Sequence, residues 1–111
     1  MKRGFLVALL ALGLASTFAS PANAQNWPSK TVSMVVPFTA GGSTDTVARL
    51  IAERLAPKLG QPVIVENRAG VGGALGSDYV AKSPADGYTL LVGTASTMAI
   101  APHVYTKLPY Q

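Results

Sequence analysis

Apolar runs and helical stretches alternate along this chain, and each apolar run leads into a loop rich in glycine or hydroxyl side chains. Three runs of β-branched and aliphatic residues predict strands at residues 31–37, 62–66 and 88–93. Apolar residues at helical spacing predict helices at residues 43–56 and 74–82. This order of strands and helices predicts an α/β fold with a parallel-sheet βαβαβ core.

The first predicted helix follows a junction at residues 35–45, where a strand leads through two glycines to Ser43 or Thr44 as the N-cap. The apolar stripe that we expect to pack on the sheet consists of Val47, Leu50, Ile51 and Leu55. Pro57 is predicted to end or kink this helix, and Gly60 to complete its last turn. The N-terminus of such a helix presents backbone N–H groups to which an anion can bind.

The second predicted helix has a weaker apolar stripe. This stripe consists of Leu75, Tyr79 and Val80. Gly76 within the helix costs about 1 kcal/mol relative to alanine, so we expect a close packing contact there. The residues 62–66 form a short apolar run that is typical of a buried parallel strand. The polar loop at residues 94–97 is predicted to precede a short helix at residues 98–101.

The N-terminal segment resembles a secretory signal. Two basic residues precede an apolar run at residues 5–15, and small residues follow at positions 20–24. We expect residues 1–24 to be a signal peptide and residues 25–111 to be the mature chain. A membrane anchor is the weaker alternative, because the run is shorter than the roughly 20 apolar residues that span a bilayer.

Charge and cysteine content narrow the classes of function. Seven Lys or Arg and five Asp or Glu remain after residue 24, since two of the nine basic residues lie in the signal segment. The net charge of +2 is scattered along the chain, so we expect no nucleic-acid partner. The absence of cysteine excludes disulfides, thiolate zinc sites and a cysteine nucleophile. We expect no metal, no cofactor and no catalytic residue.

The three loops that follow the predicted strands are expected to meet at one edge of the sheet, because parallel strands end there together. They begin near Phe38, Asn67 and Thr94, and they carry Gly, Ser and Thr rather than His, Glu or Cys. This composition favours anion binding through backbone N–H groups and hydroxyls over catalysis.

Several residues at this edge admit two interpretations. Gly41 and Gly42 could form only a tight turn with positive φ, but the hydroxyls of the next two residues favour an anion site. Asp45 either stabilises the helix start and orders the loop, or binds an amino group of a ligand. Arg68 either pairs locally with Glu66, which we prefer, or clamps a carboxylate.

Two other classes of function have weaker support. Residues 70–76 have the spacing G-x-G-x-x-x-G, which differs from the G-x-G-x-x-G of a dinucleotide-binding turn. An exported α/β hydrolase with a serine at one of the three loops is the main alternative, but its G-x-S-x-G motif is absent. An interaction domain without transport function is a third possibility.

The mature segment resembles the Bug family, the periplasmic substrate-binding proteins of tripartite tricarboxylate transporters. The matching blocks lie in order along the chain and are Pro37-Phe38, Gly41-Gly42, Thr44-Asp45, residues 59–63, 65–68, 70–73, 86–91 and 108–110. The resemblance implies the first lobe of a type II, Venus-flytrap binding protein, of which residues 25–111 would be a part.

This resemblance also implies a monomeric periplasmic protein of a Gram-negative bacterium. Such a protein would capture a small carboxylate-containing ligand and deliver it to a membrane permease. The ligand-binding positions carried over from the family are Phe38, Thr39, Ala40, Gly41, Gly42, Ser43, Thr44, Asp45, Gly72, Gly73, Thr94, Ala95, Ser96 and Thr97. We further expect Gly42→Val to abolish binding, through bulk over the amides and through strain at a positive φ.

Overall fold

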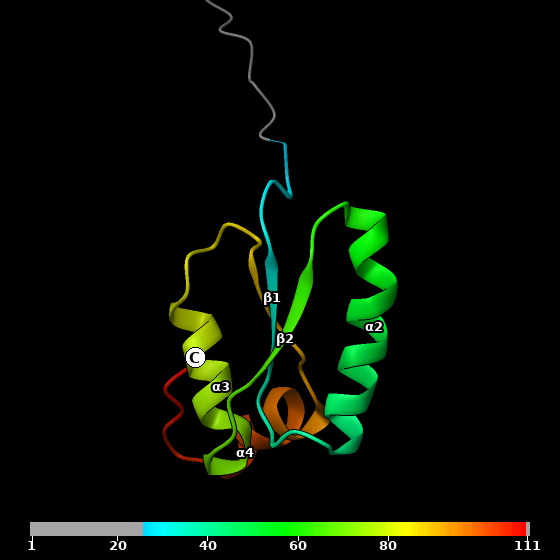
Figure 1. The fold of residues 1–111 in the computed structure, drawn as a ribbon. Helices are drawn as coiled ribbons and strands as arrows, with labels where there is room; N and C mark the ends of the chain where they lie inside the picture. The colour runs from blue at the N-terminus through cyan, green and yellow to red at the C-terminus, as the bar shows by residue number, and fades with distance from the viewer. Residues whose placement is uncertain (1–25, 111) are drawn as a thin grey trace, which may run out of the picture.

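The computed structural model describes residues 26–110 and has the predicted α/β architecture (Figure 1). The expected signal peptide lies outside the described residues. Three strands form a parallel sheet in the order β2-β1-β3. The elements, in chain order, are β1 (Val32–Val36), α2 (Ser43–Leu59), β2 (Val63–Asn67), a 3-10 turn (Val71–Gly73), α3 (Ala74–Lys82), β3 (Thr89–Leu91), a π-helical turn (Ser96–Ile100) and α4 (Ala101–Val104).

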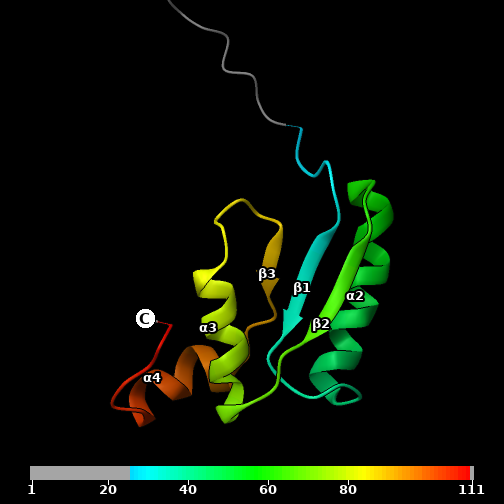
Figure 2. The same cartoon turned by 60° about the vertical axis from the view of Figure 1, so that its left-hand side comes forward.

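The two long helices cover opposite faces of the sheet. Helix α2 packs on β1 and β2, whereas α3 packs on β1 and β3, and Figure 2 shows the sheet between them. Strand β1 lies in the centre, so Val32, Val35 and Val36 are wholly buried. Met34 and Val36 cluster with Ala48 of α2 in the apolar core. The predicted parallel βαβαβ core is therefore confirmed.

Helix α2 begins and ends differently from the prediction. Its N-cap is Gly42, so Ser43 and Thr44 are its first helical residues, and no side chain caps it. The helix passes through Pro57, which is exposed, and ends at Gly60, whose left-handed φ of 70° and bond to the Ala56 carbonyl complete the last turn. The prediction for Gly60 is confirmed, and a helix end at Pro57 was wrong because the chain there faces water.

Three of the four residues in the predicted apolar stripe of α2 do not face the sheet, whereas the fourth, Leu55, packs against the apolar core as expected. Val47, Leu50 and Ile51 are 48–56% exposed, and they line an apolar hollow of about 420 Å³ on the flank of the helix. The face that packs on the sheet instead carries Asp45, Ala48 and Ala52. Small side chains let the helix axis approach the strands closely, which is why the large residues point aside.

Helix α3 follows the same pattern. Its bounds agree with the prediction, but Leu75 and Tyr79 are exposed whereas Ala74, Gly76 and Ser77 are buried. A Cβ atom on Gly76 would lie 2.8 Å from both the Pro37 Cα and the Arg68 carbonyl oxygen. The close contact expected at Gly76 is therefore confirmed, and it brings α3 against the ends of two strands.

Two further expectations need correction. Strand β2 is an edge strand of the described sheet, and Ile64 is 56% exposed, so it is not the fully buried strand that its apolar sequence predicted. The loop expected at residues 94–97 is shorter, because helical structure begins at Ala95 and includes Ser96 and Thr97.

Candidate functional site

The three loops that follow the strands meet at one edge of the sheet, as the parallel topology predicted. Gly73 of the second loop marks the meeting point. A Cβ atom at Gly73 would lie 3.3 Å from Cζ of Phe38, in the first loop, and 2.5 Å from Cγ2 of Thr97, in the third. Gly73 also has φ of 93°, so both its conformation and its neighbours require glycine.

A pocket lies where the chain diverges to the two faces of the sheet. The chain after β1 enters α2 on one face of the sheet, whereas the chain after β3 enters the π-helical turn, which contacts the 3-10 turn that precedes α3 on the other face. Such divergence points at the carboxyl ends of strands are where open α/β sheets bind ligands. Six residues from α2 and the third loop line this pocket of about 270 Å³ and are Ser43, Thr44, Val47, Val92, Gly93 and Thr94.

Backbone N–H groups at the start of α2 are directed toward this edge. Within residues 26–110, nothing accepts a hydrogen bond from the amides of Gly42, Ser43 or Thr44. They form the positive end of a 17-residue helix. The arrangement can bind a carboxylate through N–H groups and the two exposed or half-exposed hydroxyls that follow Gly42.

The neighbouring amide of Gly41 is already used inside the protein. It donates a hydrogen bond of 2.9 Å to Oδ2 of Asp45. Gly41 has the positive φ of this loop, 88°, whereas Gly42 has φ of −77° and is extended. The expectation of a strained φ at Gly42 was therefore wrong. Gly41 makes the turn with positive φ, whereas the available amides begin at Gly42.

Asp45 is buried and is the centre of a cluster of hydrogen bonds. Its carboxylate accepts from Nε of Arg49 at 3.0 Å, from the Gly41 amide, and from Nδ2 of Asn67 at 2.9 Å. These donors, Arg49 first, outweigh burial and lower the pKa of Asp45 to about 2. Ordering of the loop, the first of the two interpretations of Asp45, agrees with these contacts.

Asn67 and Arg49 are members of this cluster that the sequence-based site lacked. Besides Asp45, Nδ2 of Asn67 donates to the Phe38 carbonyl at 3.2 Å, and Oδ1 accepts from Nη2 of Arg49 at 3.1 Å. Arg49 follows Asp45 by one helical turn, a spacing at which opposite charges pair, so the sequence held a signal for it. The signal for Asn67 was its position directly after a predicted strand.

The third loop uses its hydroxyls within the protein. The Thr94 amide donates to Oγ1 of Thr97 at 3.1 Å, the Thr97 amide lies 3.4 Å from Oγ1 of Thr94, and Thr97 is wholly buried. This reciprocal bonding caps the helical segment that begins at Ala95. Of the predicted contacts in this block, Ala95 and Ser96 are exposed.

The Thr97 carbonyl has a partner from the C-terminal segment. The π-helical turn pairs the Ala101 amide with the Ser96 carbonyl, and Pro102 has no N–H group to offer to Thr97. The Tyr110 hydroxyl donates to this carbonyl at 2.9 Å. Tyr110 therefore fastens the end of the described chain to the third loop.

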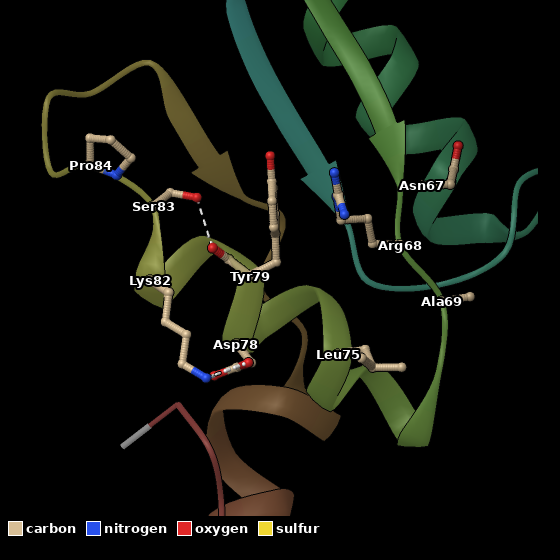
Figure 3. Close-up of a pocket in the computed structure, with 9 residues that line it drawn as sticks. All are labelled: Asn67, Arg68, Ala69, Leu75, Asp78, Tyr79, Lys82, Ser83 and Pro84. Atoms are coloured by element: carbon tan, nitrogen blue, oxygen red, sulfur yellow. Dashed lines mark hydrogen bonds and ion pairs between the residues drawn. The ribbon is translucent and has the colours of Figure 1, made fainter.

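A larger hollow of about 810 Å³ lies between the end of β2 and the outer face of α3 (Figure 3). Its charged groups already have partners. Arg68 bonds to Oε1 of Glu66 at 2.8 Å and stacks 3.5 Å over the Tyr79 ring, while Lys82 pairs with Asp78 at 2.8 Å. The local pairing that we preferred for Arg68 is confirmed, and the hollow is the weaker candidate for an anion.

Within residues 26–110, no three His, Cys, Asp or Glu side chains lie together in a group that could hold a metal ion. Within the same range, no helix has the length and apolar character needed to cross a membrane.

Comparisons with known proteins agree on one family. Residues 47–111 match the family described as "Tripartite tricarboxylate transporter family receptor" (TctC). Protein BugT of Bordetella pertussis is 44% identical over 108 residues, which cover 96% of this chain and 33% of BugT. The chain thus spans about a third of the length of this curated relative.

Solved structures give the same fold. MatC from Rhodopseudomonas palustris with bound malate is 48% identical, with a TM-score of 0.74 over 77% of this chain and 29% of MatC. The periplasmic binding protein BugD is 52% identical, with a TM-score of 0.58 over 59% of this chain and 22% of BugD. Both share the α/β fold of this chain, and BugD is named as a periplasmic binding protein, which agrees with the prediction of a protein that is not an enzyme. The chain belongs to the TctC family of tripartite tricarboxylate transporter receptors, the family that its sequence resembles.

Proposed function

We propose that this chain contributes the anion-binding part of a periplasmic receptor for a small carboxylate. The ligand carboxylate would lie in the pocket between α2 and the third loop. Its oxygens would accept hydrogen bonds from the amides of Gly42, Ser43 and Thr44 and from the two hydroxyls. The observation that carries the proposal is the uncapped start of α2 at the divergence point of the sheet.

The magnitude of the expected contacts supports such a site. A hydrogen bond to a charged group contributes roughly 1.5 to 3 kcal/mol. Three or four of these bonds suffice for micromolar affinity when both walls of a cleft are present, after the cost of association is subtracted. Since the chain covers about a third of its relatives' length, we expect the isolated chain to bind more weakly than that.

The remaining predicted contacts form the surroundings of this pocket. Phe38, Thr39 and Ala40 would shape the first loop, and Gly72 and Gly73 the second. Thr94 to Thr97 would form the opposite wall, mainly through backbone and the exposed Ser96. We propose Asp45 as a residue that holds the loop, because three donors already occupy its oxygens.

The family assignment supports a periplasmic location and a permease partner. The relatives include a protein named as a periplasmic binding protein, and the N-terminal residues have the pattern of an export signal. We propose that the longer receptor is exported as a monomer, closes two lobes on its ligand, and delivers it to the permease of a tripartite tricarboxylate transporter.

Nuclear magnetic resonance titration of the full chain tests the site, since it detects weak binding residue by residue. We expect malate and other carboxylates of one to three carboxyl groups to shift the amide signals of Gly42, Ser43 and Thr44. Gly42→Val should abolish these shifts. A Cβ atom at Gly42 has only the Thr39 carbonyl oxygen within 4 Å, at 3.8 Å, so the variant should fold.

Two outcomes would count against the proposal. Shifts that map to the hollow beside α3 would place the anion elsewhere. Turnover of an ester by the chain, without any carboxylate binding, would favour the hydrolase alternative.

A further inference from the structure

Asn67 joins two parts of the proposed site that are distant in sequence. It is the last residue of β2 and is paired in register with Val36, the last residue of β1. From there its side chain reaches the Phe38 carbonyl at 3.2 Å and Oδ1 of Asp45 at 2.9 Å. Asn67 thus connects the second loop with both ends of the first loop.

The partners of Asn67 require an amide side chain. Phe38 and Asp45 present only acceptors, so the Nδ2 group must face them. Arg49 presents only donors, and it bonds to Oδ1 at 3.1 Å. Asparagine alone combines two donors and an acceptor on so short a side chain, whereas aspartate of the same shape would face acceptors with an acceptor.

The consequence of these bonds lies at the start of α2. Asp45 holds the Gly41 amide at 2.9 Å, and Asn67 holds Asp45 and the Phe38 carbonyl. The segment between Phe38 and Asp45 is therefore fixed at both ends, and the amides of Gly42 to Thr44 lie within it. Fixing donors before a ligand arrives reduces the ordering cost of binding.

We infer that Asn67 is the positioning residue of the carboxylate site, because it holds the first loop and α2 in the geometry that presents the Gly42 to Thr44 amides. This inference rests on the proposed function. Asn67 itself needs no contact with the ligand, and its effect passes through Phe38 and Asp45.

The first experiment needs no ligand. Amide signals of the full chain are compared for wild type, Asn67→Ala and Asn67→Asp, with Asn26→Ala as the control because Asn26 is exposed before β1. We expect shifts and faster hydrogen exchange confined to residues 38–45 in both Asn67 variants, larger in Asn67→Asp. Unchanged signals in that segment would overturn the inference.

The second experiment adds malate as the probe. Wild type tests the proposed function by itself, and Asn67→Ala should then bind about tenfold more weakly, while Asn26→Ala binds as wild type does. If Asn67 only filled space, the isosteric Asn67→Asp would bind malate as wild type does. Weaker malate binding by Asn67→Asp than by Asn67→Ala therefore supports a positioning role.

The outcomes separate the two claims. If wild type binds malate and both Asn67 variants bind it equally well, positioning is wrong and the proposed function stands. If wild type binds no carboxylate, the proposed function fails, and the ligand-free comparison alone decides whether Asn67 positions the loop.

Discussion

Two helix starts face the same edge of this sheet, and only one of them satisfies its backbone N–H groups with side chains. The segment after Thr94 caps itself, since Thr94 and Thr97 exchange bonds between amides and hydroxyls. Helix α2 starts at Gly42 without any side-chain cap, although it carries hydroxyls at the next two positions. We call the capped start at Thr94 the closed terminus and the uncapped start at Gly42 the open terminus. At the open terminus, the backbone N–H groups of Gly42, Ser43 and Thr44 are available to bind a ligand.

The difference does not come from composition, because both segments are rich in hydroxyl residues. It comes from which backbone N–H group each side chain accepts a hydrogen bond from. Asp45 lies inside α2 and bonds back to Gly41, one residue before the N-cap, so the turn is stabilised and the first-turn amides stay available. The two termini can be changed separately, and four predictions test their roles.

The largest effect is expected where the two termini are held together. Gly73→Ala should lower the free energy of unfolding by about 2 to 4 kcal/mol. The new Cβ atom would collide with Thr97 and Phe38, and the alanine would keep the positive φ of Gly73. Gly41→Ala is the matched control, since it has a similar φ but nothing within 4 Å. It should cost about 1 kcal/mol. Equal losses in urea denaturation would show that strain, and not the contact, decides.

Removal of the hydrogen bond between the Thr94 amide and the Thr97 hydroxyl should have the next largest effect on the free energy of unfolding. Thr97→Val keeps the buried shape but removes the hydroxyl that accepts from the Thr94 amide, and it should cost about 1 to 2 kcal/mol. Ser96→Ala, which removes an exposed hydroxyl from the same turn, should leave stability within about 0.5 kcal/mol. The comparison by urea denaturation fails if the two variants are equally stable.

The stability that the hydrogen bonds of Asp45 give to the start of α2 should depend on pH. The pKa of Asp45 is lowered from its ordinary 3.8 to about 2, so its ionised form is favoured in the folded state. This stabilisation is fully present above about pH 4 and is lost as pH falls through 2. Wild type should therefore lose more stability than Asp45→Asn between pH 5 and pH 2. Parallel pH profiles of the urea midpoint would contradict this expectation.

The smallest effects on stability are expected for exposed hydroxyls, and these separate stability from binding. Ser43→Ala and Ser96→Ala should each change the free energy of unfolding by less than about 0.5 kcal/mol. Ser43→Ala should weaken malate binding by roughly fivefold through loss of one hydrogen bond, and Ser96→Ala should weaken it less. Equal weakening would show that the closed terminus contributes as much as the open one.

The fold was predictable because strands and turns depend on local patterns. The bounds of α3, the central strand β1 and the role of Gly76 all followed from apolar runs and glycine placement. The faces of the helices were not predictable in this way. Val47, Leu50 and Ile51 have the spacing of a packed apolar face, yet they are exposed, while Ala48, Ala52 and Leu55 lie toward the sheet.

The sequence allowed us to predict which loops form the site, but not which groups within them form hydrogen bonds with one another. Parallel topology brought Phe38, Gly73 and Thr97 together, as expected. Which amide remained available depended on Asp45 taking that of Gly41, and on Asn67 holding Asp45 from another strand. Contacts between residues 22 positions apart leave no periodic trace in the sequence.

Val47 lines two hollows, the small pocket at the start of α2 and the apolar hollow along its flank. Any polypeptide that covers this flank to remove Leu50 and Ile51 from water would therefore also reach the mouth of the pocket. Val47 thus belongs both to the apolar flank of the helix and to the pocket proposed for the carboxylate.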